Sequence, residues 1–332
     1  MRLQLNNTMD ESQVIRDYLE DELRAFEEFL WASVESANPR IAEIVQYLFQ
    51  SLGKQLRPIL VFLSAKACGG IRPETYRGAV AVELLHNATL IHDDVIDESK
   101  LRRSRPSVNA VFDNTRSVLV GDYLLSSSLK ESAATNDLEI MRIMAELGRN
   151  LAEGELNQYS LATEIIVDEA AYFDVIEKKT ASLMRACTVI GARTAGADEK
   201  TVALFRELGS NLGISFQIRD DIFDYFKGDI GKPTGNDIRE GKITLPLIFA
   251  LENAPENESQ AMMQIIRSRD YSEENIHTLL KFAKENDGIE YAYSIMNDYL
   301  QKAESILEQL AIDEEINRLL QTLLLYLRNR EY

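Results

Sequence analysis

The amino-acid sequence predicts an all-α protein, and three observations support this prediction. Only 7 prolines and 16 glycines occur among 332 residues, as expected for long helices with short connections. Apolar residues recur at helical spacing, whereas the strict alternation typical of strands is scarce. Apolar residues make up 45% of the chain, so a large core can be buried. We expect one domain over residues 1–332, built as a single bundle of antiparallel helices.

Helical spacing and punctuation residues place the individual elements. We expect helices over residues 11–36, 39–51, 58–69, 73–97, 106–133, 137–161, 168–196, 198–227, 242–252, 258–268, 272–286, 288–310 and 312–329. Pro58 and Pro73 indicate helix starts, since proline is favoured in the first turn. The segment 227–241 holds four glycines and one proline. A loop of about 14 residues in a compact domain is more often functional than accidental, so we expect a lid here.

Composition narrows the class of partner. The 54 acidic residues exceed the 36 lysines and arginines, giving a net charge of −18 that disfavours nucleic acid as a partner. Cys68 and Cys187 are too few for a disulfide framework or a cysteine-based zinc site. Residues 1–11 lack the apolar run of a signal peptide, and no stretch approaches the roughly 20 apolar residues of a transmembrane helix. We therefore expect a cytoplasmic protein without a transmembrane segment.

Two acidic clusters repeat the pattern Asp-Asp-x-x-Asp, one within residues 90–97 and one within 217–224. The first contains Asp93, Asp94 and Asp97. The second contains Asp220, Asp221 and Asp224. Carboxylates three and four apart share one edge of a helix, where their mutual repulsion is relieved by cations. Oxygen ligands of this kind suit Mg²⁺. A solvated helix face explains one such cluster about as well, but two clusters beside apolar residues favour metal binding.

Basic residues accompany these clusters. Those at helix ends or beside an acidic motif are Lys54, Arg57, Arg102, Arg103, Lys179, Lys232 and Lys242. A diphosphate bridged by Mg²⁺ and bound by lysine and arginine explains why both signs crowd together. His86 lies two helical turns before Asp93 and faces the same way, which favours a ligand-binding role over a structural one.

With these motifs assembled, the sequence resembles the trans-isoprenyl diphosphate synthases over nearly the whole chain. The matching motifs are Gly53-Lys54-Gln55-Leu56-Arg57-Pro58, the two aspartate clusters with Lys179-Thr180 between them, and Gly241-Lys242. The resemblance implies the isoprenoid synthase fold, with a deep central cavity, and about three Mg²⁺ ions. It places those ions on the first cluster and on Asp220 and Asp221, with Asp224 either supporting the ligands from behind or acting through water.

The resemblance also implies roles for the other polar residues. The allylic diphosphate, such as farnesyl diphosphate, would be held by Arg102, Lys179, Lys232 and Lys242. Isopentenyl diphosphate would be held by Lys54, Arg57, His86 and Arg103. Thr180 and Gln217 would line the carbocation that forms when the allylic C–O bond ionises. The double bond of isopentenyl diphosphate then attacks that cation, and the released diphosphate accepts the lost proton.

Product length depends on the helix that ends in the first cluster. Ala88 and Thr89 lie one turn before Asp93, at a level that an aromatic residue blocks in short-chain members of the family. An isoprene unit of roughly 5 Å matches the helix pitch of about 5.4 Å, so each open turn admits about one more unit. Leu85 lies one turn deeper and is only moderately bulky. We therefore expect a long-chain synthase of the octaprenyl type, making quinone side chains.

The resemblance further implies a homodimer, with residues 119–129 as a plausible interface, and a lipid product that would draw the protein to membranes. Several alternatives stay open. A shorter farnesyl or geranylgeranyl diphosphate synthase is one, and the catalytic subunit of a heteromeric heptaprenyl-type synthase is another. A class I terpene cyclase would lack the second cluster and the Lys54/Arg57 pair. Close helix packing also explains Ala88 and Thr89, and an acidic helical scaffold that binds divalent cations explains the two clusters without catalysis.

Overall fold

The computed structural model describes residues 11–50, 52–102, 105–226 and 234–328. The fold is all-α, as predicted, apart from one short antiparallel strand pair in the described residues. The elements are α1 (Glu11–Tyr18), α2 (Glu20–Ser33), α3 (Pro39–Phe49), α4 (Leu56–Ala67), α5 (Pro73–Ile96), β1 (Leu101–Arg102), β2 (Arg105–Pro106), α6 (Val108–Phe112), α7 (Asn114–Ala133), α8 (Leu138–Glu164), α9 (Glu169–Ile176), a π-helical turn η1 (Glu177–Ala181), α10 (Ser182–Ala195), α11 (Glu199–Phe223), α12 (Asn236–Arg239), α13 (Leu245–Asn253), α14 (Glu256–Ser268), α15 (Glu273–Glu285), α16 (Gly288–Gln309) and α17 (Glu314–Arg328).

The chain forms two compact units, each assembled from segments that are far apart in the sequence. The first unit comprises the described parts of residues 1–148, 184–206 and 310–323. The second comprises those of residues 149–183, 207–309 and 324–332. The first aspartate cluster belongs to the first unit and the second cluster to the second unit.

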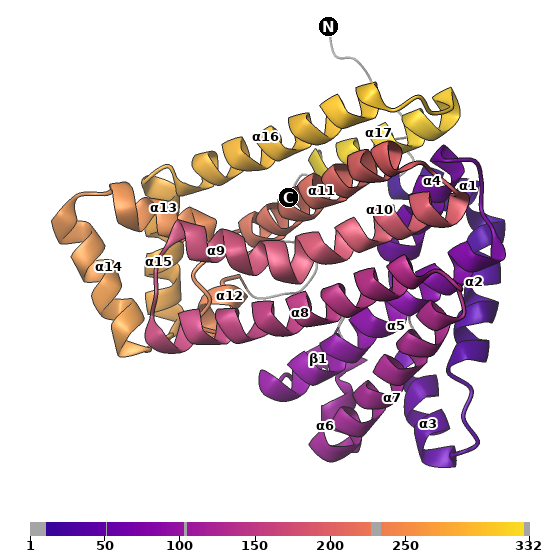
Figure 1. Ribbon diagram of the computed structural model, residues 1–332. Coiled ribbons are helices and arrows are strands. Elements are labelled where there is room, and N and C mark those ends of the chain that lie inside the picture. The colour runs from indigo at the N-terminus through magenta and orange to yellow at the C-terminus, as the bar shows by residue number, and fades with distance from the viewer. Residues whose placement is uncertain (1–10, 51, 103–104, 227–233, 329–332) are drawn as a thin grey trace, which may run out of the picture. The chain divides into compact units, whose positions relative to one another are not determined.

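Helix α5 is the central element of the first unit. It is apolar on most of its faces, with Val80, Ala81, Val82 and Leu84 fully buried. Helices α2, α4 and α7 pack against it, and α7 runs alongside much of its length (Figure 1). A helix that is apolar all round needs neighbours on every side, which explains its central position. The packing holds the carboxyl end of α5, with the first aspartate cluster, in a fixed place.

Helix α13 has the corresponding role in the second unit. Its residues Leu245, Leu247 and Ile248 are buried, and Pro246 lies in its first turn, where proline is favoured. Helices α9, α14, α15 and α16 all pack against it (Figure 1). This packing fixes α9, which carries one side of the pocket described below.

The structure confirms the predicted class but corrects several boundaries. The prediction of a single helix over residues 106–133 was wrong, because α6 and α7 are separate helices that follow the β1–β2 pair. Asp113 breaks the helix with a φ of 86°, and its side chain accepts a hydrogen bond from the Arg116 N–H to begin α7. The predicted helix over 11–36 divides into α1 and α2 at Leu19. Among the described helices, none combines the length and apolarity needed to cross a bilayer.

Two further departures lie beside the second cluster. The predicted helix over 168–196 contains a π-helical turn, and this turn carries Lys179 and Thr180. Wide turns of this kind are often found at functional sites. The predicted loop over 227–241 contains the short helix α12. Its first part, residues 227–233, lies outside the described residues, as does the lid hypothesis that depends on it.

Candidate active site

The first aspartate cluster ends helix α5, and its three carboxylates differ in their surroundings. Asp94 is only 3% exposed, and Arg102 binds it closely. The Arg102 Nη2 lies 2.5 Å from Oδ1, and Nε donates to both carboxylate oxygens at 2.9 and 3.0 Å. Burial raises the pKa of Asp94, and the Arg102 hydrogen bonds and charge oppose that rise. Asp94 and Arg102 therefore form a mostly buried ion pair within this unit.

Asp93 and Asp97 are more accessible than Asp94. Asp93 is half-buried and Asp97 is exposed. The Asp97 N–H donates to the Asp93 carbonyl at 2.8 Å, which closes the last turn of the helix. Asn109 supports the same turn by donating from Nδ2 to the Asp94 carbonyl at 3.0 Å. The end of α5 is thus held by its own backbone and by α6, while two of its carboxylates reach solvent.

The predicted isopentenyl diphosphate ligands belong to the same unit. Lys54 is exposed and Arg57 is half-buried at the start of α4. Arg16 fixes this helix start by donating to the Lys54 carbonyl at 2.9 Å and to the Gln55 side chain at 3.1 Å. His86 is buried on α5, with 8% exposure. Arg103 lies outside the described residues.

The predicted chain-length residues lie on α5, below the first cluster. Ala88 is fully buried, Leu85 is 5% exposed and Thr89 is half-buried. The Thr89 hydroxyl donates to the His86 carbonyl at 2.9 Å, so its polar group is bonded to its own helix. A cavity of about 60 Å³ next to the same helix is lined by Asn87, Leu90, Ile91 and Asp94, among others.

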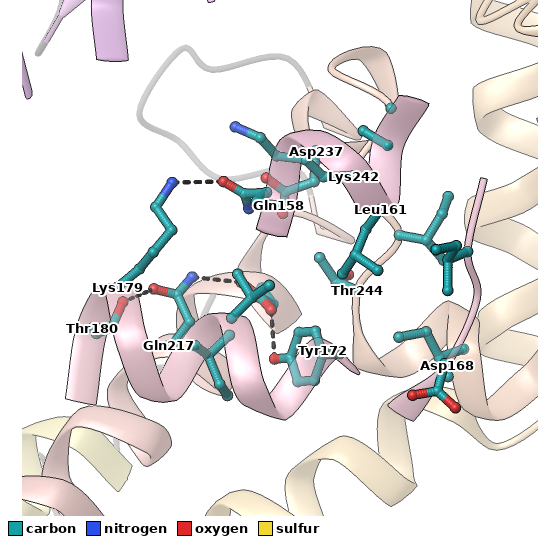
Figure 2. A pocket seen from close by; sticks show the side chains of 18 residues that line it. Gln158, Leu161, Asp168, Tyr172, Lys179, Thr180, Gln217, Asp237, Lys242 and Thr244 are labelled. Atoms are coloured by element: carbon teal, nitrogen blue, oxygen red, sulfur yellow. Dashed lines mark hydrogen bonds between the residues drawn. The ribbon is translucent and has the colours of Figure 1, made fainter. Parts of the chain in front are cut away.

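The second unit contains a pocket of about 220 Å³ beside the second aspartate cluster (Figure 2). Helices α8, α9 and α11, the π-helical turn and the segment before α13 all contribute to its walls. Its polar lining comprises Gln158, Asp168, Tyr172, Lys179, Thr180, Gln217, Asp221, Asp237, Lys242 and Thr244. Apolar side chains such as Leu161, Val175 and Ile176 line the remainder. The pocket thus combines cationic, anionic and neutral polar groups with apolar walls.

A chain of hydrogen bonds crosses this pocket (Figure 2). Thr180 Oγ1 donates to Gln217 Oε1 at 2.6 Å, and Gln217 Nε2 donates to Asp221 Oδ1 at 2.7 Å. The Tyr172 hydroxyl donates to the other oxygen, Oδ2, at 2.6 Å. Burial raises the pKa of Asp221 to about 7, against the effect of these bonds and together with the charges of Asp220 and Asp224. Three of the predicted site residues therefore form one connected network.

Lys179 enters the pocket from the π-helical turn. Its ammonium donates to Gln158 Oε1 at 2.6 Å and forms an ion pair with Glu155, both on α8. Gly154 makes this approach possible, since a Cβ there would lie 2.7 Å from Lys179 Cγ. Lys242 is also half-buried at the pocket wall, with an ion pair of 2.6 Å to Glu240. Lys232, predicted to act with them, lies outside the described residues.

Asp224 organises the chain that returns to the pocket. Its two carboxylate oxygens accept the N–H groups of Asn236 and Asp237 at 2.9 and 3.0 Å, and its carbonyl accepts that of Gly235. These bonds anchor the start of α12. Asp237 lines the pocket, and burial, followed by the charges of Asp221 and Asp224, raises its pKa well above the usual range.

Asp220 is the most accessible carboxylate of the second cluster, with 44% of its side chain exposed. Arg219 Nη2 lies 3.2 Å from its Oδ1. Arg219 itself is 3% exposed, and its guanidinium carbon lies about 5 Å from the ring centroids of Phe216 and Phe223. These faces attract the buried cation. Arg219 therefore holds Asp220 at the surface of α11 from the apolar side.

The carboxylates of the two clusters could hold a metal ion only at open sites. Among the residues that the structure describes, no group of three or more His, Cys, Asp or Glu side chains converges as a ready-made cage. Mg²⁺ usually binds one or two carboxylates and completes its shell with water and substrate phosphate. The accessible Asp93, Asp97 and Asp220 fit such open sites. Asp94 and Asp221 are buried, and together with Asp224 they accept hydrogen bonds from protein donors, as Asp220 also does from Arg219.

Several residues in or beside the pocket were not predicted, notably Tyr172, Asp237, and Gln158 and Glu155 on α8. Tyr172 had a usable signal, because it lies seven residues before Lys179 and so faces the same way along the helix. A spacing of seven residues also separates His86 from Asp93. Asp237 and the α8 residues carry no comparable pattern, since their contacts depend on tertiary packing.

Comparisons with known proteins identify the family of this chain. A family model described as polyprenyl synthetase matches residues 38–283. The heptaprenyl diphosphate synthase component 2 of Geobacillus stearothermophilus is 34% identical over 317 residues, which cover 95% of this chain and 98% of that protein.

Solved structures match equally well. A decaprenyl diphosphate synthase from Rhodobacter capsulatus superposes with a TM-score of 0.91 at 34% identity, covering 96% of this chain and 99% of that one. A geranylgeranyl pyrophosphate synthase from Bacteroides thetaiotaomicron superposes with a TM-score of 0.83 at 39% identity, covering 97% of this chain and 100% of that one. A polyprenyl synthase from Caulobacter crescentus, solved with calcium and isoprenyl diphosphate, gives 0.89 at 28% identity, covering 98% and 100%.

The family model spans more than two thirds of the chain, and the relatives named as synthases match it almost from end to end. The acidic scaffold and the terpene cyclase are therefore set aside. This chain belongs to the polyprenyl synthetase family and is a prenyltransferase of the polyprenyl diphosphate synthase type.

Proposed function

We propose that the protein condenses isopentenyl diphosphate with an allylic diphosphate, with about three Mg²⁺ ions, to make a long all-trans polyprenyl diphosphate. The full chain would act as one catalytic domain. The observation that carries the proposal is the network in the second unit, where Lys179, Thr180, Gln217 and Asp221 line one pocket. A cation for the leaving diphosphate and neutral oxygens for a carbocation are thereby supplied side by side.

The oxygens of this network suit a positively charged intermediate. Thr180 uses its hydroxyl hydrogen on Gln217, so the remaining lone pairs of both oxygens are available to a cation in the pocket. Preorganised dipoles of this kind are usually the largest contribution to rate acceleration. The apolar side chains of Leu161, Val175 and Ile176 limit water at the wall, which protects a carbocation from hydration.

Diphosphate binding is assigned to the charged residues around the clusters. Bound Mg²⁺ would neutralise the leaving diphosphate, held through Asp93, Asp94, Asp97, Asp220 and Asp221, with Asp224 acting through water. Lys179 would exchange its bonds with Glu155 and Gln158 for the allylic diphosphate, which Arg102, Lys232 and Lys242 would also bind. Isopentenyl diphosphate would bind at Lys54, Arg57, His86 and Arg103.

A long product is supported by the side chains of α5. Ala88 adds no bulk at the level one turn before Asp93, and Leu85 is only moderately large. The relatives themselves differ in product, since a decaprenyl and a geranylgeranyl synthase both match closely. The small side chains at positions 88 and 89 favour the longer products, for which quinone side chains are the proposed use.

A homodimer is proposed through α7. Leu119 and Leu129 are 62% and 58% exposed on this helix, and Val118 adds a third apolar side chain. Burying such residues stabilises an interface by removing apolar area from water. The competing arrangement is a heteromer, because one relative is named as component 2 of a heptaprenyl diphosphate synthase.

The purified chain alone tests both proposals. With farnesyl diphosphate and radiolabelled isopentenyl diphosphate, we expect labelled product in the presence of Mg²⁺ and none with excess chelator. Size-exclusion chromatography with light scattering should give the mass of two chains. No product from a correctly folded, Mg²⁺-supplied protein would contradict the homomeric synthase.

A further inference from the structure

Asp221 is the most buried carboxylate of its cluster. Its side chain is 4% exposed, and each of its two oxygens accepts a short hydrogen bond from a different direction. One bond comes from Gln217 on the same helix, α11, four residues earlier. The other comes from Tyr172 on α9, 49 residues earlier in the chain. The second bond therefore fixes the rotation of the carboxylate against a separate element.

Tyr172 is itself well fixed. Its N–H donates to the carbonyl of Asp168, the residue that caps α9 and whose side chain accepts from Ala171 N at 2.6 Å. Its ring is 5% exposed and packs edge-on against Phe173 at 5.4 Å between centroids. The Tyr172 hydroxyl donates to Asp221 Oδ2 at 2.6 Å, and the dashed line from its ring in Figure 2 marks this bond.

The direction of every hydrogen bond in the network follows from Asp221. The Gln217 side chain turns its NH₂ group toward Asp221 and donates to Oδ1 at 2.7 Å. The Gln217 oxygen then faces Thr180, whose hydroxyl must donate to it. If Asp221 rotated away, the amide of Gln217 would be free to turn, and the oxygens that line the pocket would lose their orientation.

We propose that Tyr172 is a positioning residue of this active site: its hydroxyl fixes the Asp221 carboxylate, and through Asp221 it orients the Gln217 amide and the Thr180 hydroxyl. The inference rests on the proposed function of the same pocket. Tyr172 acts through Asp221 and contributes no charge of its own. Groups that orient a metal-binding carboxylate commonly change metal affinity or activity by about 10- to 100-fold when they are removed.

The substitution Tyr172→Phe tests the proposal, because it removes the hydroxyl and keeps the ring that packs on Phe173. Tyr291→Phe is a matched control. The Tyr291 hydroxyl also donates to a carboxylate of α9, that of Glu169, at 2.9 and 3.1 Å, and it lies outside the pocket. Each variant loses one hydrogen bond from a tyrosine hydroxyl to a carboxylate in the same unit. Tyr172→Phe loses the bond to Asp221, whereas Tyr291→Phe loses the bond to Glu169.

Metal binding is measured by electron paramagnetic resonance of Mn²⁺ with inorganic diphosphate present, alongside kcat and KM. We expect Mn²⁺ affinity or kcat in Tyr172→Phe to fall about 10- to 100-fold. The KM for isopentenyl diphosphate should stay within about twofold, and Tyr291→Phe should match the wild type. In an Asp221→Asn background, Tyr172→Phe should have little further effect, since coupled residues are not additive.

Two results would overturn the proposal. One is unchanged Mn²⁺ affinity and kcat in Tyr172→Phe, including the case where only its melting temperature falls. The other is an equal loss from Tyr172→Phe in the wild-type and the Asp221→Asn backgrounds. The product of the wild-type protein, recorded in the same experiment, tests the proposed function. Mn²⁺ binding can still be compared between the variants if the wild type is inactive, so the two proposals can fail separately.

Discussion

The buried ion pair between Asp94 and Arg102 gives the sharpest stability prediction. The substitution Arg102→Gln leaves a carboxylate of 3% exposure without its cationic partner. Breaking a buried pair costs about 3–5 kcal/mol. The Arg102 side chain is 38% exposed, so water can partly replace it as a partner of Asp94. We therefore expect Arg102→Gln to lower the free energy of unfolding by about 2 kcal/mol. For units of roughly 150–250 residues this corresponds to a fall of about 4–8 °C in Tm.

The loss should depend on pH in a defined direction. Burial already raises the pKa of Asp94 in the folded protein, and Arg102 opposes that rise, so removing Arg102 raises it further. When the pKa of a carboxyl is higher in the folded state than in the unfolded state, the protonated form stabilises the folded protein. That stabilisation is lost as the pH rises through the folded-state pKa. The difference in Tm between the wild type and Arg102→Gln should therefore shrink from pH 8 to pH 5.

Thermal unfolding followed by circular dichroism, in the presence of a chelator, measures this difference. Arg116→Gln is the control, because Arg116 forms a half-exposed pair with Asp113 at 3.6 Å in the same unit and should lose less than about 1 kcal/mol. Equal Tm values for the two variants at pH 8 would refute the reasoning. So would a difference that grows as the pH falls.

Three further substitutions test the site. Asp220→Ala should lower turnover by at least a hundredfold at saturating Mg²⁺ with unchanged helical circular dichroism, and near-normal turnover would remove Asp220 from the metal site. Lys54→Ala should raise the KM for isopentenyl diphosphate about 10- to 100-fold, because a charge-assisted hydrogen bond contributes about 1.5–3 kcal/mol. A larger rise in the KM for the allylic diphosphate would show that Lys54 belongs to the allylic site instead. Ala88→Tyr should yield mainly products of roughly three or four isoprene units by one unit per helical turn, as judged by chromatography, whereas an unchanged long product would show that the chain grows elsewhere.

The helices were predictable where local signals agree with packing. The predicted helix over 73–97 matches α5, because Pro73 opens it and its apolar residues continue without interruption to the first cluster. The break at Asp113 was missed because its cause is a positive φ at a residue that also occurs inside helices. The π-helical turn at residues 177–181 was missed because no residue type marks an extra backbone residue within a helix.

Of the predicted site residues, Lys179, Thr180, Gln217, Asp221 and Lys242 line one pocket, but the contacts of the individual carboxylates could not be predicted. Spacing identified the aspartates as a shared helix edge, but it could not distinguish Asp94, which is buried against Arg102, from the exposed Asp97. Likewise, Asp224 resembles its neighbours in sequence, yet it anchors the start of α12 through two backbone N–H groups. Such differences arise from contacts between segments that are distant in the chain.

The most direct test of the account is the length of the product made by the purified chain alone. Farnesyl diphosphate and excess radiolabelled isopentenyl diphosphate are supplied with Mg²⁺, and the dephosphorylated products are separated by reversed-phase chromatography. A homomeric long-chain synthase should give a ladder that continues well beyond four isoprene units and ends at one dominant long polyprenol. A ladder that stops at three or four units, or a product that appears only when a second protein is added, would contradict it.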